Sequence, residues 1–147
     1  MKIAVIDDTQ MNVTLLQHLL KKLPECTVNG FTDPVAALHW CLENQPDLII
    51  VDYMMPDMNG IELSERFRLS NPVAPILMVT ANHEVEVRHQ ALTAGVTDFL
   101  NKPIDNTEFL ARTKNMLALQ RSHSQLAQEV RAATAQIVEQ ERETIFS

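Results

Sequence analysis

Short apolar runs alternate with amphipathic stretches over the first hundred residues of the chain. The apolar runs, four to six residues long, predict β-strands near 2–7, 26–31, 47–52, 75–80 and 97–101. The stretches between them place apolar residues at helical spacing, which predicts helices near 11–23, 34–44, 60–70 and 84–94. Strands that alternate with helices in this way are typical of βα units on a parallel sheet.

Residues with strong turn and capping preferences stand at the expected element boundaries. Asp8 or Thr9 can cap the first helix, and Asp33 with Pro34 can open the second. Asn59-Gly60 marks the turn before the third helix. The predicted strands at 47–52 and 75–80 show little polar alternation, so both of their faces should be buried under helices. Because βα crossovers are right-handed, we expect a three-layer α/β sandwich around a five-stranded parallel sheet.

The pattern changes after Pro103. From Thr107 to about Glu143 the sequence contains neither Gly nor Pro, and apolar residues recur in heptads. One heptad position holds Phe109, Met116, His123, Val130, Ile137 and Thr144, and the other holds Leu119, Leu126, Ala133 and Gln140. A continuous helix of about 37 residues would be about 55 Å long, far beyond the width of the sandwich. Only its first half can pack on the sheet.

Two interpretations remain for the second half of this helix. It is either a solvated tail, which the polar His123, Gln140 and Thr144 on the heptad seam support, or one strand of a two-stranded coiled coil. Glu129 and Arg131 are among the charges that would flank such a seam. The heptad repeat favours the coiled coil, and with it a homodimer of the chain.

Composition and charge narrow the class of protein. A length of 147 residues, 46% of them apolar, is ordinary for one globular domain, and no stretch approaches the roughly 18 apolar residues of a membrane span. We expect a soluble, cytoplasmic protein that does not associate with membranes. Residues 1–106 carry seven Lys or Arg against fourteen Asp or Glu, and residues 107–147 carry five of each. The net charge of −7 therefore lies in the first part, which argues against nucleic-acid binding.

Polar side chains follow four of the apolar runs. They are Asp7 with Asp8, Asp52, Thr80, and Lys102 with Pro103. Because the carboxyl ends of parallel strands meet at one edge of a sheet, these side chains should share one crevice. Carboxylates about 6 Å apart repel each other by roughly 3 kcal/mol at an effective dielectric constant near 20, so three of them need a cation. Oxygen-only ligands favour Mg²⁺.

Such a crevice suits the transfer of a phosphoryl group. Asp52 is the expected nucleophile, since a carboxylate near Mg²⁺ can attack phosphorus and form an acyl phosphate. Lys102 would balance the charge of the phosphoryl oxygens, and Thr80 would donate its hydroxyl to them. We also predict a cis Lys102-Pro103 bond, which would direct the ammonium group into the crevice.

These residues together resemble a known family. The resemblance is to the CheY-like receiver domain of two-component response regulators, and it is carried by Asp7-Asp8, residues 52–60 (DYMMPDMNG), Thr80-Ala81 and Lys102-Pro103. It covers about residues 1–120 and implies a flavodoxin-like (βα)5 fold. It also implies that Asp52 accepts a phosphoryl group from the phosphohistidine of a sensor histidine kinase or a phosphotransfer protein.

The resemblance further implies a set of Mg²⁺ ligands. Asp7 and Asp52 would bind the ion directly, Asp8 would act largely through water, and the backbone carbonyl of Met54 would complete the protein ligands.

The resemblance assigns a switch to Thr80 and Phe99. On phosphorylation the hydroxyl would move toward the phosphate and the aromatic ring would turn inward. The output face would then comprise the fourth and fifth helices with the strand between them. Candidate members of that surface are Ala91, Leu92, Ala94 and Gly95, with core packing as the alternative for the apolar ones.

The C-terminal part carries a second, looser resemblance. Residues 126–134 (LAQEVRAAT) and 139–146 (EQERETIF) are similar to the linker that joins receivers to HD-GYP domains, which are cyclic di-GMP phosphodiesterases. We therefore expect a receiver at 1–120 and a coiled-coil linker at 121–147 that leads to an effector domain absent from this chain. Without that enzyme's metal-binding histidines, this chain should catalyse only its own phosphorylation and dephosphorylation.

Three other functions fit parts of the pattern. A phosphohydrolase of the haloacid dehalogenase type also uses a strand-end Asp and Mg²⁺, but separates its two acids by one residue, whereas Asp7 and Asp8 are adjacent. A flavin-binding module needs a hydroxyl- or glycine-rich phosphate loop where this chain has acids. A receiver that serves only as a dimerising scaffold would not need the complete phosphotransfer set.

Overall fold

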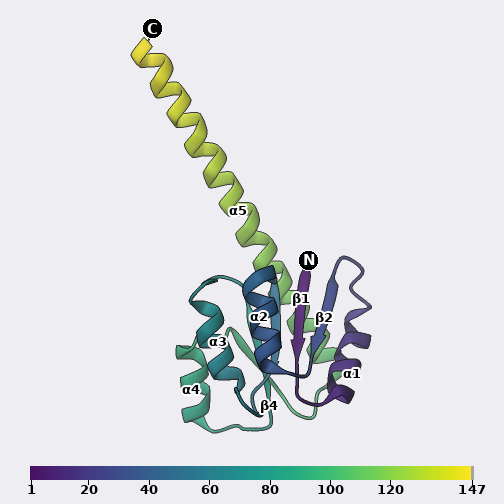
Figure 1. The fold of residues 1–147 in the computed structure, drawn as a ribbon. Helices are drawn as coiled ribbons and strands as arrows, with labels where there is room; N and C mark the ends of the chain where they lie inside the picture. Colours follow the sequence, from purple (N-terminus) through teal and green to yellow (C-terminus); the bar gives the residue numbers. More distant parts are fainter. Residues whose placement is uncertain (147) are drawn as a thin grey trace.

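The structure, a computed structural model, describes the backbone of residues 1–146 and the side chains of residues 1–134. Within this part, five strands alternate with five helices (Figure 1). In chain order they are β1 (Lys2–Ile6), α1 (Gln10–Leu20), β2 (Thr27–Phe31), α2 (Pro34–Asn44), β3 (Leu48–Asp52), α3 (Gly60–Arg68), β4 (Ile76–Thr80), α4 (Val85–Thr93), β5 (Asp98–Asn101) and α5 (Asn106–Phe146).

The five strands form one parallel sheet, as the sequence predicts. Their order is β2-β1-β3-β4-β5, and every neighbouring pair is parallel. The chain therefore moves outward from β1 to β2, crosses back to β3 and then continues in the other direction. This reversal lies between β1 and β3, and ligands of open parallel sheets bind beyond the carboxyl ends of the strands at such a point.

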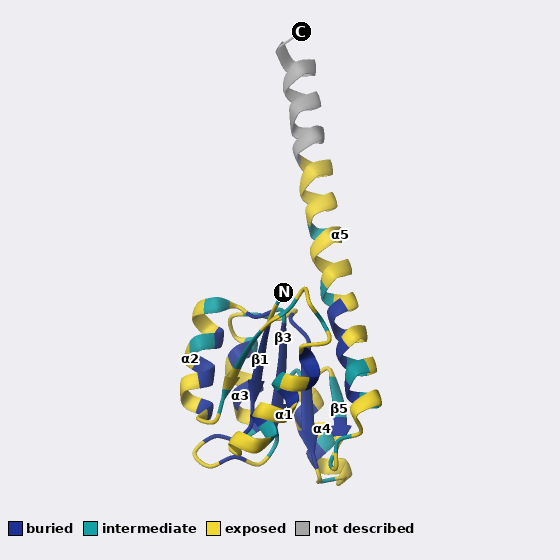
Figure 2. Cartoon of the chain, turned by 90° about the vertical axis from the view of Figure 1, so that its right-hand side faces the viewer, coloured by how far each residue is buried: buried dark blue, intermediate teal, exposed yellow. Residues whose placement is uncertain are grey.

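Two hydrophobic cores cover the two faces of the sheet. Along β3, Ile49 and Val51 face the core under α2, α3 and α4, whereas Leu48 and Ile50 face the core under α1 and α5. All five residues of β3 and all five of β4 are buried, which confirms that both faces of these strands are covered. Figure 2 shows the buried residues concentrated in the sheet and in the helix faces that contact it.

Local hydrogen bonds set the beginnings of the helices. The Asp33 carboxylate accepts the Val35 N–H at 3.0 Å, and Asn59 forms a reciprocal capping box with Glu62 at the start of α3. Thr9 occupies the cap position of α1 without a side-chain capping bond.

The ends of two helices come earlier than the sequence pattern suggests. α1 ends at Leu20 instead of residue 23, and α3 ends at Arg68 instead of residue 70. Pro24 and Pro72 follow these ends, and proline disfavours helical backbone in the residue before it. After each of these two helices, the backbone forms a short turn before it reaches the proline.

α4 presents fewer apolar residues to solvent than expected. Ala91 is fully buried and Ala94 is 6% exposed, because both pack into the core shared by α2, α3 and α4. Of the two interpretations of these alanines, core packing is therefore confirmed and membership of an output surface is wrong. Leu92 is 52% exposed, and Gly95 has a φ of +100° at the turn into β5.

The last helix extends well beyond the sandwich (Figure 1). Its first turns are anchored by Phe109, Thr113, Met116 and Leu117, which are buried. Beyond them, apolar side chains are exposed: Leu119 is 58%, Leu126 59% and Val130 59% accessible to solvent. The expected heptad residues Ile137, Gln140 and Thr144 lie outside the described side chains. No helix within residues 1–146 has the length and apolar character that a membrane crossing requires.

Candidate functional site

Three carboxylates gather where β1 and β3 end. The last paired residues of these neighbouring strands are Ile6 and Val51, so Asp7 and Asp52 follow side by side. An oxygen of each of Asp7, Asp8 and Asp52 lies within 4.8 Å of the others. Asp7 is 3% exposed and Asp52 is 5% exposed, whereas Asp8 faces solvent. Two of the three acids are thus buried, and only Asp8 is open to water.

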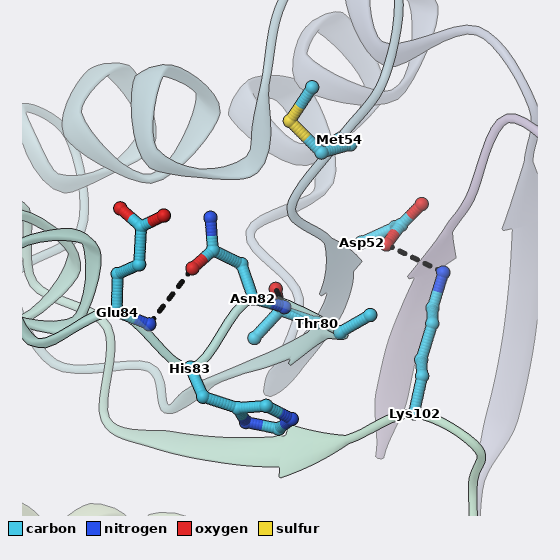
Figure 3. A pocket seen from close by; sticks show the side chains of 8 residues that line it. Asp52, Met54, Thr80, Asn82, His83, Glu84 and Lys102 are labelled. Atoms are coloured by element: carbon cyan, nitrogen blue, oxygen red, sulfur yellow. Dashed lines mark hydrogen bonds and ion pairs between the residues drawn. The ribbon is translucent and has the colours of Figure 1, made fainter.

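The ammonium group of Lys102 reaches this cluster from the end of β5. Thr80 pairs with Asn101 at the end of β4 and β5, which brings the next residue, Lys102, to the same edge. The Lys102 ammonium lies 2.9 Å from Asp52 Oδ1, the ion pair drawn in Figure 3. It also lies 3.8 Å from Asp7 Oδ2. The Lys102-Pro103 peptide bond is cis, and the Lys102 N–H donates to the Thr80 carbonyl at 3.0 Å.

Burial dominates the electrostatics of Asp52. Desolvation raises the pKa of this carboxyl, the hydrogen bond and charge of Lys102 lower it, and repulsion from Asp7 and Asp8 raises it further, with a net increase. Three carboxylates face one ammonium group, so part of their negative charge has no partner among these residues. The uncompensated negative charge, offered only by oxygen atoms, fits a hard divalent cation such as Mg²⁺.

A crevice of about 640 Å³ opens beside Asp52 and Lys102 (Figure 3). Its other lining residues are Met54, Thr80, Ala81, Asn82, His83 and Glu84. The crevice therefore offers space for a phosphoryl group next to the Asp52 carboxylate. Met54, which is 67% exposed, stands at the mouth of this space.

Hydrogen bonds in the β4–α4 loop engage Thr80. Its hydroxyl accepts the Asn82 N–H at 2.9 Å, and the Asn82 side-chain oxygen accepts the Glu84 N–H at 2.9 Å. Thr80 itself is 2% exposed. Two successive hydrogen bonds thus connect the Thr80 hydroxyl to the start of α4. The β4–α4 loop, which forms one wall of the crevice, therefore depends on the orientation of this hydroxyl.

Phe99 lies in β5 but does not line the crevice. Its ring is half-buried against the core under α2, α3 and α4, and the guanidinium carbon of Arg88 lies 5.5 Å from the ring centroid. This distance is within the range of a cation–π interaction. Arg88 was not among the residues that the sequence singled out.

Asn12 is a second residue that the sequence analysis missed. Its side-chain amide donates to Asp7 Oδ2 at 3.2 Å. The signal was present, because a helix that starts three residues after Asp7 turns its third residue back toward the strand end. Without the position of α1, however, an Asn in a first helical turn reads as an ordinary polar surface residue.

Comparison with known proteins identifies the fold and the family. The sequence profile of the response regulator receiver domain matches residues 3–114. The chain belongs to this receiver family. Phosphotransfer in two-component signalling is the function of the family, and its partners are histidine kinases or phosphotransfer proteins.

Relatives of this receiver extend the comparison to the rest of the chain. The cyclic di-GMP phosphodiesterase response regulator RpfG of Xanthomonas campestris pv. campestris is 39% identical to it over 99% of this chain. The alkaline phosphatase synthesis transcriptional regulatory protein PhoP of Bacillus subtilis is 36% identical over 79% of it. The chain covers 41% of RpfG and 48% of PhoP, which is less than half of either protein.

Solved structures agree with the fold of the receiver. The signal receiver domain of an HD domain-containing protein from Pseudomonas fluorescens Pf-5 superimposes with a TM-score of 0.76 at 27% identity, covering 82% of this chain and 97% of that one. The chemotaxis protein CheY4 of Vibrio cholerae gives a TM-score of 0.74 at 27% identity, covering 79% and 98%. The family match and this architecture leave no reason to retain the haloacid dehalogenase and flavin interpretations.

Proposed function

We propose that Asp52 is the phosphoacceptor of this receiver. The observation that carries the proposal is the position of its carboxylate, which is 2.9 Å from the Lys102 ammonium, beside Asp7 and Asp8, and open to the crevice. In the reaction, a carboxylate oxygen of Asp52 forms a bond to phosphorus while the bond between phosphorus and the histidine nitrogen of the donor breaks. The donor is a sensor histidine kinase or a phosphotransfer protein.

The acid cluster would hold Mg²⁺ during this transfer. Asp7, Asp52 and the backbone carbonyl of Met54 would bind the ion, and Asp8 would act through water. When bound, the ion would supply positive charge for the phosphoryl oxygens. Lys102 adds a second positive charge on the side of β5, and its ammonium stays within reach of the new acyl phosphate.

The phosphoryl group would change the β4–α4 loop through Thr80. To donate to a phosphoryl oxygen, the Thr80 hydroxyl would turn toward Asp52, and its hydrogen bond with the Asn82 N–H would change. Phe99 would turn inward as the loop moves, and so leave Arg88. Inverting a two-state equilibrium from 1:99 to 99:1 takes about 5.5 kcal/mol, which is within the range of several charge-assisted hydrogen bonds to a dianion.

We assign residues 1–120 to the receiver and residues 121–147 to a linker that pairs with a second copy as a coiled coil. The exposed Leu119, Leu126 and Val130 support this pairing, since they share one heptad seam. The similarity to RpfG supports an HD-GYP cyclic di-GMP phosphodiesterase as the effector that the switch controls. A cytoplasmic location belongs to this proposal, because a sensor kinase draws its phosphoryl group from cytoplasmic ATP.

Incubation with acetyl phosphate and Mg²⁺ tests the proposal. We expect the chain to incorporate phosphate, to form no coloured flavin complex and to release no inorganic phosphate from simple phosphate esters. The Asp52→Asn variant should incorporate no phosphate above background and keep the wild-type circular dichroism spectrum. If the variant incorporates phosphate at the normal rate, Asp52 is not the acceptor.

A dimerising scaffold that ignores phosphate remains the alternative function. Sedimentation with and without beryllofluoride and Mg²⁺ separates the two. A switch predicts that the phosphoryl mimic binds and changes the association of the chain, whereas a scaffold predicts the same association in both conditions.

A further inference from the structure

Both oxygens of the Asp7 carboxylate are held by α1. Oδ1 accepts the Thr9 N–H at 2.9 Å, and Oδ2 accepts the Asn12 amide at 3.2 Å. Lys102 is farther from the same Oδ2, at 3.8 Å, and lies closer to Asp52. Asn12 is therefore the nearest side-chain donor to Asp7 within residues 1–134.

The position of Asn12 in the helix explains this contact. Thr9 caps α1, Asn12 is the third residue of the helix, and its own N–H donates to the Thr9 carbonyl at 3.1 Å. A side chain in the first turn points back along the helix toward its start, where the strand end of β1 lies. The amide is half-buried, and it reaches the carboxylate without entering the crevice, whose lining does not include it.

We propose that Asn12 is a positioning residue for the metal site: its amide fixes the Asp7 carboxylate for the divalent cation and leaves Lys102 to Asp52. This inference rests on the proposed function, because it concerns the Mg²⁺ of that reaction. An amide serves this purpose since it donates a hydrogen bond without adding charge to a cluster that already holds three acids.

The contact is compatible with a bound cation. A carboxylate oxygen has two lone pairs, so Oδ2 can accept the Asn12 amide and still face a ligand on its other side. Loss of the amide removes this restraint, and the carboxylate and Lys102 can then pair with each other in the absence of metal. Binding the cation would require that pair to separate again, which weakens affinity.

The test compares Mg²⁺ affinities of the intact chain by isothermal titration calorimetry. We expect Asn12→Ala and Asn12→Ser to weaken Mg²⁺ binding roughly tenfold, as is typical when a hydrogen-bond partner of a metal ligand is removed. The matched control is Gln10→Ala, which removes an amide from the same helical turn whose partner is the Thr14 hydroxyl, at 3.1 Å. This control should keep the wild-type affinity.

A second readout separates positioning from a structural role. At saturating Mg²⁺, phosphate incorporation from acetyl phosphate should recover most of the wild-type rate in Asn12→Ala, and the circular dichroism spectrum should be unchanged. Equal Mg²⁺ affinities for wild type and both Asn12 variants would overturn the inference, as would an equal loss in Gln10→Ala. If the wild-type chain itself binds no Mg²⁺, the proposed function fails instead.

Discussion

The sandwich and the outer half of α5 differ in what covers their apolar residues. The strands β3 and β4 are enclosed by helices on both faces of the sheet, and Phe67 of α3 is fully buried in the core on one face. Leu126 and Val130, in contrast, are each 59% exposed on a helix that extends alone. The sandwich is therefore stabilised by contacts between its own strands and helices. An isolated helix in water is marginal, so the proposed pairing with a second copy would stabilise the outer half of α5.

Truncating a buried side chain should have the largest effect on stability. Phe67 is fully buried in the core under α2, α3 and α4, so Phe67→Ala should lower the free energy of unfolding by about 3–5 kcal/mol. Val130→Ala on α5 should change it by less than about 0.5 kcal/mol in the monomer. Urea unfolding at low protein concentration measures both. Similar losses would show that the outer helix is part of the cooperative unit.

A charge introduced on the exposed heptad seam of α5 should weaken dimerisation without affecting the stability of the monomer. Leu126→Asp places two carboxylates against each other in a coiled coil and removes two leucines, each contributing about 1.5–3 kcal/mol when buried. We expect the dimer dissociation constant to rise at least about 100-fold, with no change in the unfolding of the monomer. Gln128→Asp is the matched control, since it adds the same charge away from the seam. Sedimentation equilibrium decides, and equal effects of both variants would refute the seam.

The buried Asp52 carboxylate should lower the free energy of unfolding of the sandwich when no metal ion is bound. Two carboxylates less than 5 Å apart repel by about 3 kcal/mol at an effective dielectric constant of 20, and Lys102 offsets only part of this. Asp52→Asn should therefore raise the free energy of unfolding at pH 7 by about 1–2 kcal/mol without Mg²⁺.

The pH dependence of this gain follows from the raised pKa of Asp52. Between the unfolded pKa near 3.9 and the higher folded pKa, the folded state binds the extra proton, so wild-type stability rises as the pH falls through this window. The difference in the free energy of unfolding between Asp52→Asn and the wild type should therefore shrink as the pH falls through this window. It should vanish with saturating Mg²⁺. Urea unfolding from pH 4 to pH 7 measures it. A gain that does not change with pH would contradict the assigned cause.

The smallest effect should come from Arg88 of α4, whose guanidinium group lies over the Phe99 ring of β5. A cation–π contact at a partly exposed site contributes about 0.5–1 kcal/mol, and in this chain it stabilises the ring in its present position. Arg88→Met should therefore tighten beryllofluoride binding in the presence of Mg²⁺ by about two- to fivefold. Arg66→Met removes a positive charge from α3 and is the control. Weaker binding in Arg88→Met would mean that Arg88 supports the switched state.

Much of the fold follows from the sequence because its signals are local. The apolar runs of β3 and β4 fix strands that are buried on both faces, and the absence of Gly and Pro after Thr107 fixes one continuous helix. The clustering of Asp7, Asp52 and Lys102 follows as well, since parallel strands bring their carboxyl ends to one edge.

What the sequence left open depends on the rotation and placement of whole helices. Ala91 and Ala94 could not be assigned to the core in advance, because α4 is short and weakly amphipathic. The contacts of Asn12 with Asp7 and of Arg88 with Phe99 likewise join elements whose separation is set by tertiary packing. The ends of α1 and α3 lie four residues before Pro24 and Pro72, earlier than the apolar spacing alone predicts.

We expect one buried carboxylate at the edge of the sandwich to accept the phosphoryl group. Treatment with acetyl phosphate and Mg²⁺, reduction by borohydride and peptide mass spectrometry tests it most directly, because reduction converts an aspartyl phosphate into homoserine. We predict homoserine at Asp52 alone, and none when Mg²⁺ is withheld. Homoserine at Asp8 or Asp57 instead, or at no aspartate while the protein binds Mg²⁺, would contradict the account.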